Sequence, residues 1–123
     1  VQPPIDIPRQ FGHLEVPQLV AHETTYYLVF SAQHNRQLPG SGVPTASGIY
    51  YLRANELLGT YTGPHALLAN DSGTYYSGKL IQRKDESWAL ITALVNHEDG
   101  HYTGEISDPI PVEINQRNIT VTL

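Results

Sequence analysis

The chain has 123 residues, of which 40% are hydrophobic and 15% charged, so it is long and apolar enough for one folded domain with a core. The net charge is −5 and the Lys and Arg residues are scattered, which argues against nucleic acid or an anionic membrane surface as the main partner. The absence of Cys excludes disulfides, thiol catalysis and Cys-based zinc sites, and no apolar run approaches the ~18 residues of a membrane span.

Short runs rich in Tyr, Val, Ile and Thr, broken by Gly, Pro, Asn and Asp, follow one another along the whole chain. This pattern is typical of β-strands, and helical periodicity is almost absent. In chain order, the predicted strands are 16–22, 26–32, 48–54, 60–68, 76–82, 88–94, 101–107 and 114–123. The sequence therefore predicts an all-β fold.

The predicted strands repeat. Leu19-Val20 matches Leu80-Ile81 at an offset of 61, and the same offset places 27–32 on 88–93. A four-stranded unit repeated in this way favours a partial β-propeller with about two four-stranded antiparallel blades. The expected units lie at about 14–70 and 71–123 within a single domain, 1–123. Two stacked meanders in an ordinary sandwich fit the pattern equally well, and the residues alone leave this choice open.

Two blades cannot close a propeller ring, which needs at least four. Open blade faces would expose apolar surface and strand edges. We therefore expect another protein chain, or self-association, to cover these edges. The long segment 33–47, rich in Gly and Pro, is expected at the rim of the propeller funnel, where it would affect substrate choice.

One short motif suggests chemistry. Gly12-His13-Leu14-Glu15-Val16-Pro17-Gln18 places an acid directly before an apolar strand. The motif resembles the Glu-Cys-Pro-Asp segment of the glycoside hydrolase family 32-like β-fructosidases, with Val16 in place of Cys and Gln18 in place of Asp. These enzymes are five-bladed propellers that hydrolyse sucrose and fructans, and the resemblance is to their C-terminal part. Four further segments match in the same order: 26–31, 57–61, 76–80 and 104–112.

This resemblance implies a portion of a retaining glycoside hydrolase acting on fructosides such as sucrose, inulin or levan. Glu15 would be the acid/base, and its apolar neighbours favour the partial desolvation that raises the pKa of an acid catalyst. The expected nucleophile is missing, because the chain contains neither a Trp-Asn-Asp-Pro-like segment nor Arg-Asp-Pro. Asp108-Pro109 matches a later Ser-Asp-Pro turn instead. We therefore expect the chain to be inactive without further blades.

Five other residues are candidates for contact with a carbohydrate substrate: His13, Gln18, Asp71, Tyr76 and Ser77. In the resembling family, the strand that corresponds to Tyr76-Ser77 borders the active-site funnel. Tyr76 could stack on a sugar face, and Asp71 could accept hydrogen bonds from hydroxyls. Other interpretations stay open, since tyrosines often fill an interface between sheets and a His beside a Gly is often a simple surface residue.

We expect no metal and no cofactor. The chain has six His residues, but no pair shows the helical i, i+4 spacing of a zinc site, and His97 and His101 fall in a predicted hairpin turn. The alternative function is a non-catalytic carbohydrate-binding or structural β module that oligomerises to complete its sheets. The sequence does not distinguish a bacterial cytoplasmic protein from a secreted one.

Overall fold

The computed structural model describes residues 13–33 and 46–123, and these residues form an all-β structure. Its strands are β1 (Glu15–His22), β2 (Thr25–Ala32), β3 (Ser47–Ala54), β4 (Thr62–Asn70), β5 (Tyr75–Gln82), β6 (Trp88–Asn96), β7 (Tyr102–Ile106), β8 (Ile110–Ile114) and β9 (Ile119–Val121). None of these residues forms a helix long and apolar enough to span a membrane. Most of segment 33–47 lies outside the described residues, and so does its expected place at a funnel rim.

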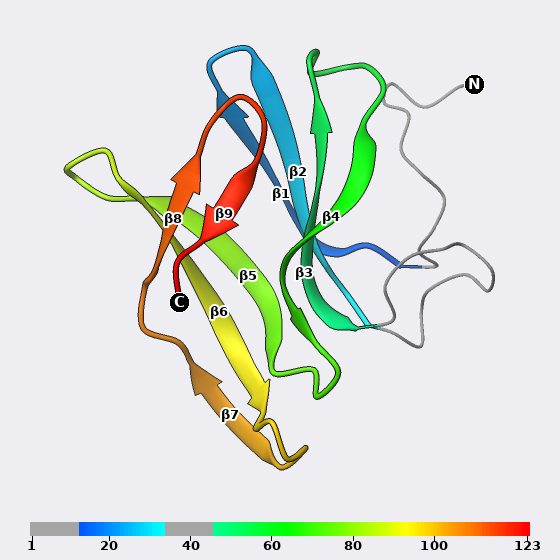
Figure 1. Ribbon diagram of the computed structural model, residues 1–123, viewed down its shortest axis with the longest axis vertical. Helices are drawn as coiled ribbons and strands as arrows, with labels where there is room; N and C mark the ends of the chain where they lie inside the picture. Colours follow the sequence, from blue (N-terminus) through cyan, green and yellow to red (C-terminus); the bar gives the residue numbers. More distant parts are fainter. Residues whose placement is uncertain (1–12, 34–45) are drawn as a thin grey trace.

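The strands build two antiparallel sheets that face each other (Figure 1). The first sheet has the order β1-β2-β3-β4, so every strand pairs with its neighbour in the chain. The second has the order β5-β6-β8-β9, with β7 also paired to β6. This arrangement is a partial β-propeller, as the sequence predicted.

The second sheet differs from the predicted four-stranded unit at its third position. The sequence predicted a strand at 114–123, but that stretch contains the turn between β8 and β9. Residues Ser107-Asp108-Pro109 interrupt the pairing with β6, so the third position is divided between β7 and β8. Pro109 has no backbone N–H to donate to β6, which explains the interruption at this point. The prediction missed β8 because Pro109 and Pro111 flank Ile110, although Pro111 still pairs in register with Ala89.

The two sheets share one unusual feature, a β-bulge in the first strand. In β1 the pairing with β2 shifts between Glu15 and Gln18, and in β5 the pairing with β6 shifts between Tyr76 and Lys79. The residue after the acid, Val16, has φ +50°, and its counterpart Ser77 has φ +55°. Both pairs of bulge boundaries are 61 residues apart, which confirms the repeat offset for the first strands.

The offset between equivalent residues of the two sheets changes to 62 after the turn of the first hairpin. Gln18 pairs with Val29, whereas Lys79 pairs with Ile91, so β2 and β6 are related by one residue more than β1 and β5. The cause is the turn. In the first sheet, His22 pairs directly with Thr25, so the turn between β1 and β2 has two residues. In the second sheet, the main-chain N–H of Arg83 donates to Ser87 O, 2.8 Å away, so the turn between β5 and β6 has three residues. The predicted match of Tyr27 with Trp88 is therefore wrong, and Tyr26 is the counterpart of Trp88.

The main core lies between the sheets. Its buried members come from both: Val20, Tyr27, Val29, Ile49, Tyr51, Leu68, Leu80, Leu90, Val112 and Ile119. A second apolar cluster covers the opposite face of the first sheet and includes Phe30, Tyr50, Leu52 and Tyr61. The rings of Tyr27 and Tyr51 meet edge to face with centroids 5.5 Å apart, a favourable geometry for aromatic pairs.

Polar contacts join the sheets where the β8–β9 turn reaches the first sheet. Tyr27 donates through its hydroxyl to Asn115 O, and Arg53 Nε donates to Gln116 O, 2.9 Å away. Thr25 Oγ1 also donates to Gln116 O, at 3.1 Å. Burial raises the pKa of the Tyr27 hydroxyl, against a smaller opposing effect of the Arg53 charge. This end of the interface is thus fixed by hydrogen bonds to main-chain oxygens.

Candidate functional site

The candidate site lies at the bulges of β1 and β5, where residues 61 positions apart meet. Glu15 pairs with Ser31 at the start of β1, and Tyr76 is its counterpart in β5. The hydroxyl of Tyr76 donates a hydrogen bond to Glu15 Oε2. Both side chains are partly buried. The structure therefore brings together the predicted acid and one of the predicted substrate-binding residues.

Two buried hydroxyl groups form hydrogen bonds with the main chain of Tyr76 and Ser77. Thr92 Oγ1 accepts a hydrogen bond from Tyr76 N at 3.1 Å and lies 2.9 Å from Tyr76 O, to which it can donate. Ser31 Oγ accepts from Ser77 N at 2.9 Å. Ser31 thus pairs with Glu15 through the strand ladder, and its side chain binds the bulge of β5. Sequence reasoning missed Ser31 and Thr92, whose only signal was a hydroxyl late in an apolar strand.

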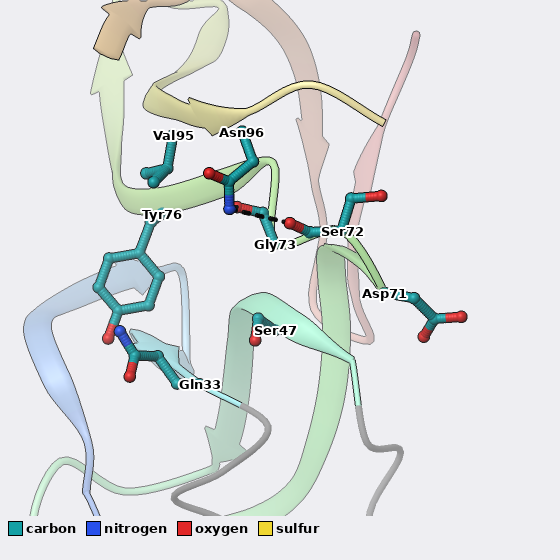
Figure 2. A pocket seen from close by; sticks show the side chains of 8 residues that line it. All are labelled: Gln33, Ser47, Asp71, Ser72, Gly73, Tyr76, Val95 and Asn96. Atoms are coloured by element: carbon teal, nitrogen blue, oxygen red, sulfur yellow. Dashed lines mark hydrogen bonds between the residues drawn. The ribbon is translucent and has the colours of Figure 1, made fainter. Parts of the chain in front are cut away.

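Tyr76 also forms one wall of an open pocket of about 180 Å³ between the β4–β5 turn and the end of β6 (Figure 2). The lining residues are Gln33, Ser47, Asp71, Ser72, Gly73, Tyr76, Val95 and Asn96. Most of them are polar, which suits a ligand with many hydroxyl groups. Gln33, Ser47 and Asn96 were not predicted as site residues, because they are single polar residues at strand ends without a motif around them.

The β4–β5 turn is ordered by its own side chains. Asn70 accepts a hydrogen bond from Thr74 N through Oδ1, at 2.9 Å, and donates to Thr74 Oγ1 through Nδ2, at 2.9 Å. Asn96 Nδ2 donates to Ser72 O at 3.0 Å, which ties the turn to β6 (Figure 2). Asp71 is exposed, and its carboxylate is directed away from Tyr76 and Gln33 in Figure 2.

The remaining predicted contacts lie elsewhere. Gln18 directs its amide to the second sheet, where Nε2 donates to Leu80 O and Oε1 accepts from Leu80 N, both at 2.8 Å. Both polar groups of this side chain are therefore engaged within the protein. His13 is exposed two residues before Glu15. The role of each of these residues toward substrate stays a prediction.

The backbone at the acid is strained. Val16 is β-branched, and such residues rarely adopt positive φ. Conformations of this kind cost roughly 1–3 kcal/mol and persist when the surrounding structure determines them. Here Lys79 Nζ donates to Val16 O and to Pro17 O, both at 3.3 Å, and places a positive charge next to the bulge. Among the described residues, no group of three or more His, Asp or Glu side chains could hold a metal ion.

Comparison with known proteins shows that the fold of this chain occurs in solved structures. No protein-family model and no curated protein matches the sequence. Solved structures do match. An inulosucrase from Halalkalicoccus jeotgali bound to kestose has 20% identity and a TM-score of 0.69, over 92% of this chain and 33% of that one. A levansucrase mutant, N252A, from B. megaterium has 18% identity and a TM-score of 0.62, over 92% of this chain and 28% of that one.

The chain has the fold of a segment of these fructan-acting propellers. An endo-1,4-beta-xylanase from Bacteroides thetaiotaomicron shares the fold too, with 21% identity and a TM-score of 0.65, over 89% of this chain and 38% of that one. The sequence predicted a fructan-acting propeller, and this is confirmed at the level of the fold. The neighbours are of the family 68 type rather than family 32. The chain spans about a third of the length of these three structures.

Proposed function

We propose that this chain is a portion of a propeller enzyme that cleaves fructosides such as sucrose, inulin or levan, with Glu15 as its acid/base. One observation carries the proposal: a carboxylate bound by the Tyr76 hydroxyl, next to a polar pocket, on the scaffold of levansucrase and inulosucrase. The two sheets would be successive blades, at about 14–70 and 71–123.

Glu15 would protonate the leaving glycosidic oxygen and then activate the attacking water or hydroxyl as a base. The hydrogen bond from Tyr76 supports this role, because it fixes the direction of the carboxylate. A retaining enzyme needs a second carboxylate about 5–5.5 Å from the first. Since the motif expected to carry that nucleophile is absent from this sequence, it would come from another segment, and we propose that the chain is inactive alone.

The outer surfaces of the sheets support a requirement for more blades. Val20 is 5% exposed between the sheets, whereas its counterpart Ile81, on the outer face of the second sheet, is 37% exposed. Ile106 and Tyr102 of β7 are also exposed. We propose that another sheet, from a further segment or a second copy of the chain, covers this face. Light scattering of the chain at rising concentration tests self-association, and a monomer throughout would eliminate the second copy.

The decisive experiment is hydrolysis of sucrose and inulin by a protein in which further segments complete the ring around this chain. Glu15→Gln should lower kcat by about 10²–10⁴-fold, the usual contribution of general acid–base catalysis. Glu113→Gln, at an exposed position in β8, is the control and should leave the rate unchanged. A Glu15→Gln enzyme at the normal rate would exclude Glu15 as the acid/base.

A non-catalytic carbohydrate-binding module is the second candidate, and the polar pocket together with the missing nucleophile favours it. Titration of the chain with kestose, followed by NMR shifts of Tyr76 and Asn96, separates the two. Binding by the chain, with no turnover in the completed ring, would select the module over the enzyme.

A further inference from the structure

The bulge of β1 determines which way Glu15 points. Glu15 pairs with Ser31 and Gln18 pairs with Val29, so the two residues between them in β1 lie opposite a single residue of β2. In a regular strand, side chains three positions apart lie on opposite faces. The extra residue reverses this, because Ser31 and Val29 share a face and their partners therefore do too. The bulge thus puts Glu15 on the same face as Gln18, toward the second sheet.

The bulge is not maintained by packing of its own side chain, since Val16 is 37% exposed. Instead, four hydrogen bonds between β1 and β5 hold it. Two run from Lys79 Nζ to the carbonyls of Val16 and Pro17, and two join the Gln18 amide to the main chain of Leu80. These bonds fall on the three residues that directly follow Glu15. We call Gln18 and Lys79 together the bulge clamp.

The two residues of the bulge clamp occupy equivalent positions in the two sheets. Gln18 and Lys79 are 61 residues apart and each ends the bulge of its own strand. Each reaches across to the other strand, so the two bulges are fixed against each other. The same relation holds for Glu15 and Tyr76, which begin the two bulges and meet at the hydroxyl–carboxylate contact. The bulges are therefore joined at both ends.

We propose that Gln18 and Lys79 are positioning residues for Glu15: by holding the left-handed bulge at Val16, they keep the carboxylate against the Tyr76 hydroxyl. Gln18 then acts through the backbone rather than on a sugar. The meaning of this for catalysis rests on the proposed function, but the structural claim can be measured in the chain as it stands.

The first experiment uses NMR of ¹³C-labelled chain to measure the contact itself, as cross-relaxation between the Glu15 side-chain protons and the Tyr76 ring protons. We expect Gln18→Met and Lys79→Met each to weaken this cross-relaxation and to change the ring signals of Tyr76, while most backbone amide signals keep their positions. Lys84→Met, in the exposed turn between β5 and β6, is the control and should change neither. Undiminished Glu15–Tyr76 cross-relaxation in both clamp variants, with both folded, would overturn the proposal.

A second variant covers the case in which a clamp variant does not fold. Val16→Gly should stay folded, because Gly adopts positive φ without strain. It should also keep the Glu15–Tyr76 cross-relaxation, since the backbone geometry rather than the Val side chain is what the clamp holds. The triple variant with Met at positions 18 and 79 should then lose this cross-relaxation. If it retains the cross-relaxation, the clamp does not position Glu15.

In the completed enzyme, each clamp variant should lower kcat by about 10- to 100-fold with little change in KM, the effect of misplacing a reacting group by about 1 Å. Lys79→Arg should restore much of the rate. The two proposals fail separately. If Glu15→Gln has no effect on the rate but the clamp variants still lose the Glu15–Tyr76 cross-relaxation, the clamp stands and the acid/base assignment falls. Clamp variants with unaltered kcat in an enzyme that needs Glu15 would refute the positioning role.

Discussion

The two sheets carry the same first hairpin in different surroundings. In the second sheet Leu80 faces the first sheet and is 3% exposed, whereas its counterpart Leu19 lies on the outer side of β1 and is 50% exposed. At the bulge, Gly78 packs against Ile49 in the interface, and its counterpart in the first sheet is the exposed Pro17. The same backbone geometry thus serves both positions, and the residue at each position follows what its sheet packs against.

The strongest test of this comparison uses the two leucines. Leu80→Ala should lower the free energy of unfolding by about 2–5 kcal/mol, because it opens a cavity in the core between the sheets. Leu19→Ala, the same change at the counterpart position, should cost well under about 1 kcal/mol because its side chain is largely hydrated. Urea unfolding of both variants measures the difference. Equal losses would mean that the two faces are not distinct in solution.

The bulge gives a second test. A Cβ on Gly78 would lie 2.4 Å from Ile49 Cδ1 and 3.0 Å from Leu90 Cδ1. Because these groups are fully buried, Gly78→Ala should destabilise the protein by about 1–3 kcal/mol, the usual cost of overpacking. Ile49→Val removes the clashing Cδ1, so the double variant should recover part of this loss in a double-mutant cycle.

Pro17→Ala is the control at the counterpart position and should have a small effect. Strictly additive losses for Gly78→Ala and Ile49→Val would show that the two residues do not touch, and the close approach of the sheets at this bulge would then be wrong.

The smallest effect concerns the other end of the interface. Burial raises the pKa of Tyr27 above that of an unfolded tyrosine, so the folded state keeps this proton at pH values where the unfolded chain loses it. Stability from this group is therefore complete below about pH 10 and declines as the pH rises above it. Tyr27→Phe should flatten the decline in the urea midpoint above about pH 10.

Tyr102→Phe, at an exposed tyrosine of β7, should not flatten this decline. Burial also raises the pKa of Tyr61, which lies in the cluster on the other face of the first sheet, so some of the decline should remain in Tyr27→Phe. A complete loss of the decline in that variant would assign the whole effect to the interface.

Much of the fold could be read from the sequence, because apolar alternation and turn residues mark strands locally. The repeat of Leu19-Val20 as Leu80-Ile81 gave the correct relation of β1 to β5. The division of the third strand into β7 and β8 could not be read, since it depends on whether a Pro-flanked segment finds a partner in β6. Only the assembled sheet decides that.

For the site, the sequence pointed to Glu15 and Tyr76 separately and not to their contact. Their meeting depends on two bulges with positive φ at Val16 and Ser77, and neither residue type signals that conformation. The sequence also predicted Gln18 as a substrate contact and gave no sign of its bonds to Leu80. Those bonds follow from how the sheets are placed, which no local pattern contains.

The extra residue in the β5–β6 turn has a practical consequence for anyone who would recombine such units. If the first hairpin were grafted onto the second by hydrophobic similarity alone, Tyr27 would take the position of Trp88. The strand would then be shifted by one residue, and each of its side chains would point to the opposite face of the sheet. Because His22 pairs directly with Thr25 while Arg83 and Ser87 enclose three residues, the turn must travel with the strands that it joins. Loop length at this position, on the surface of the molecule, determines which side chains become interior.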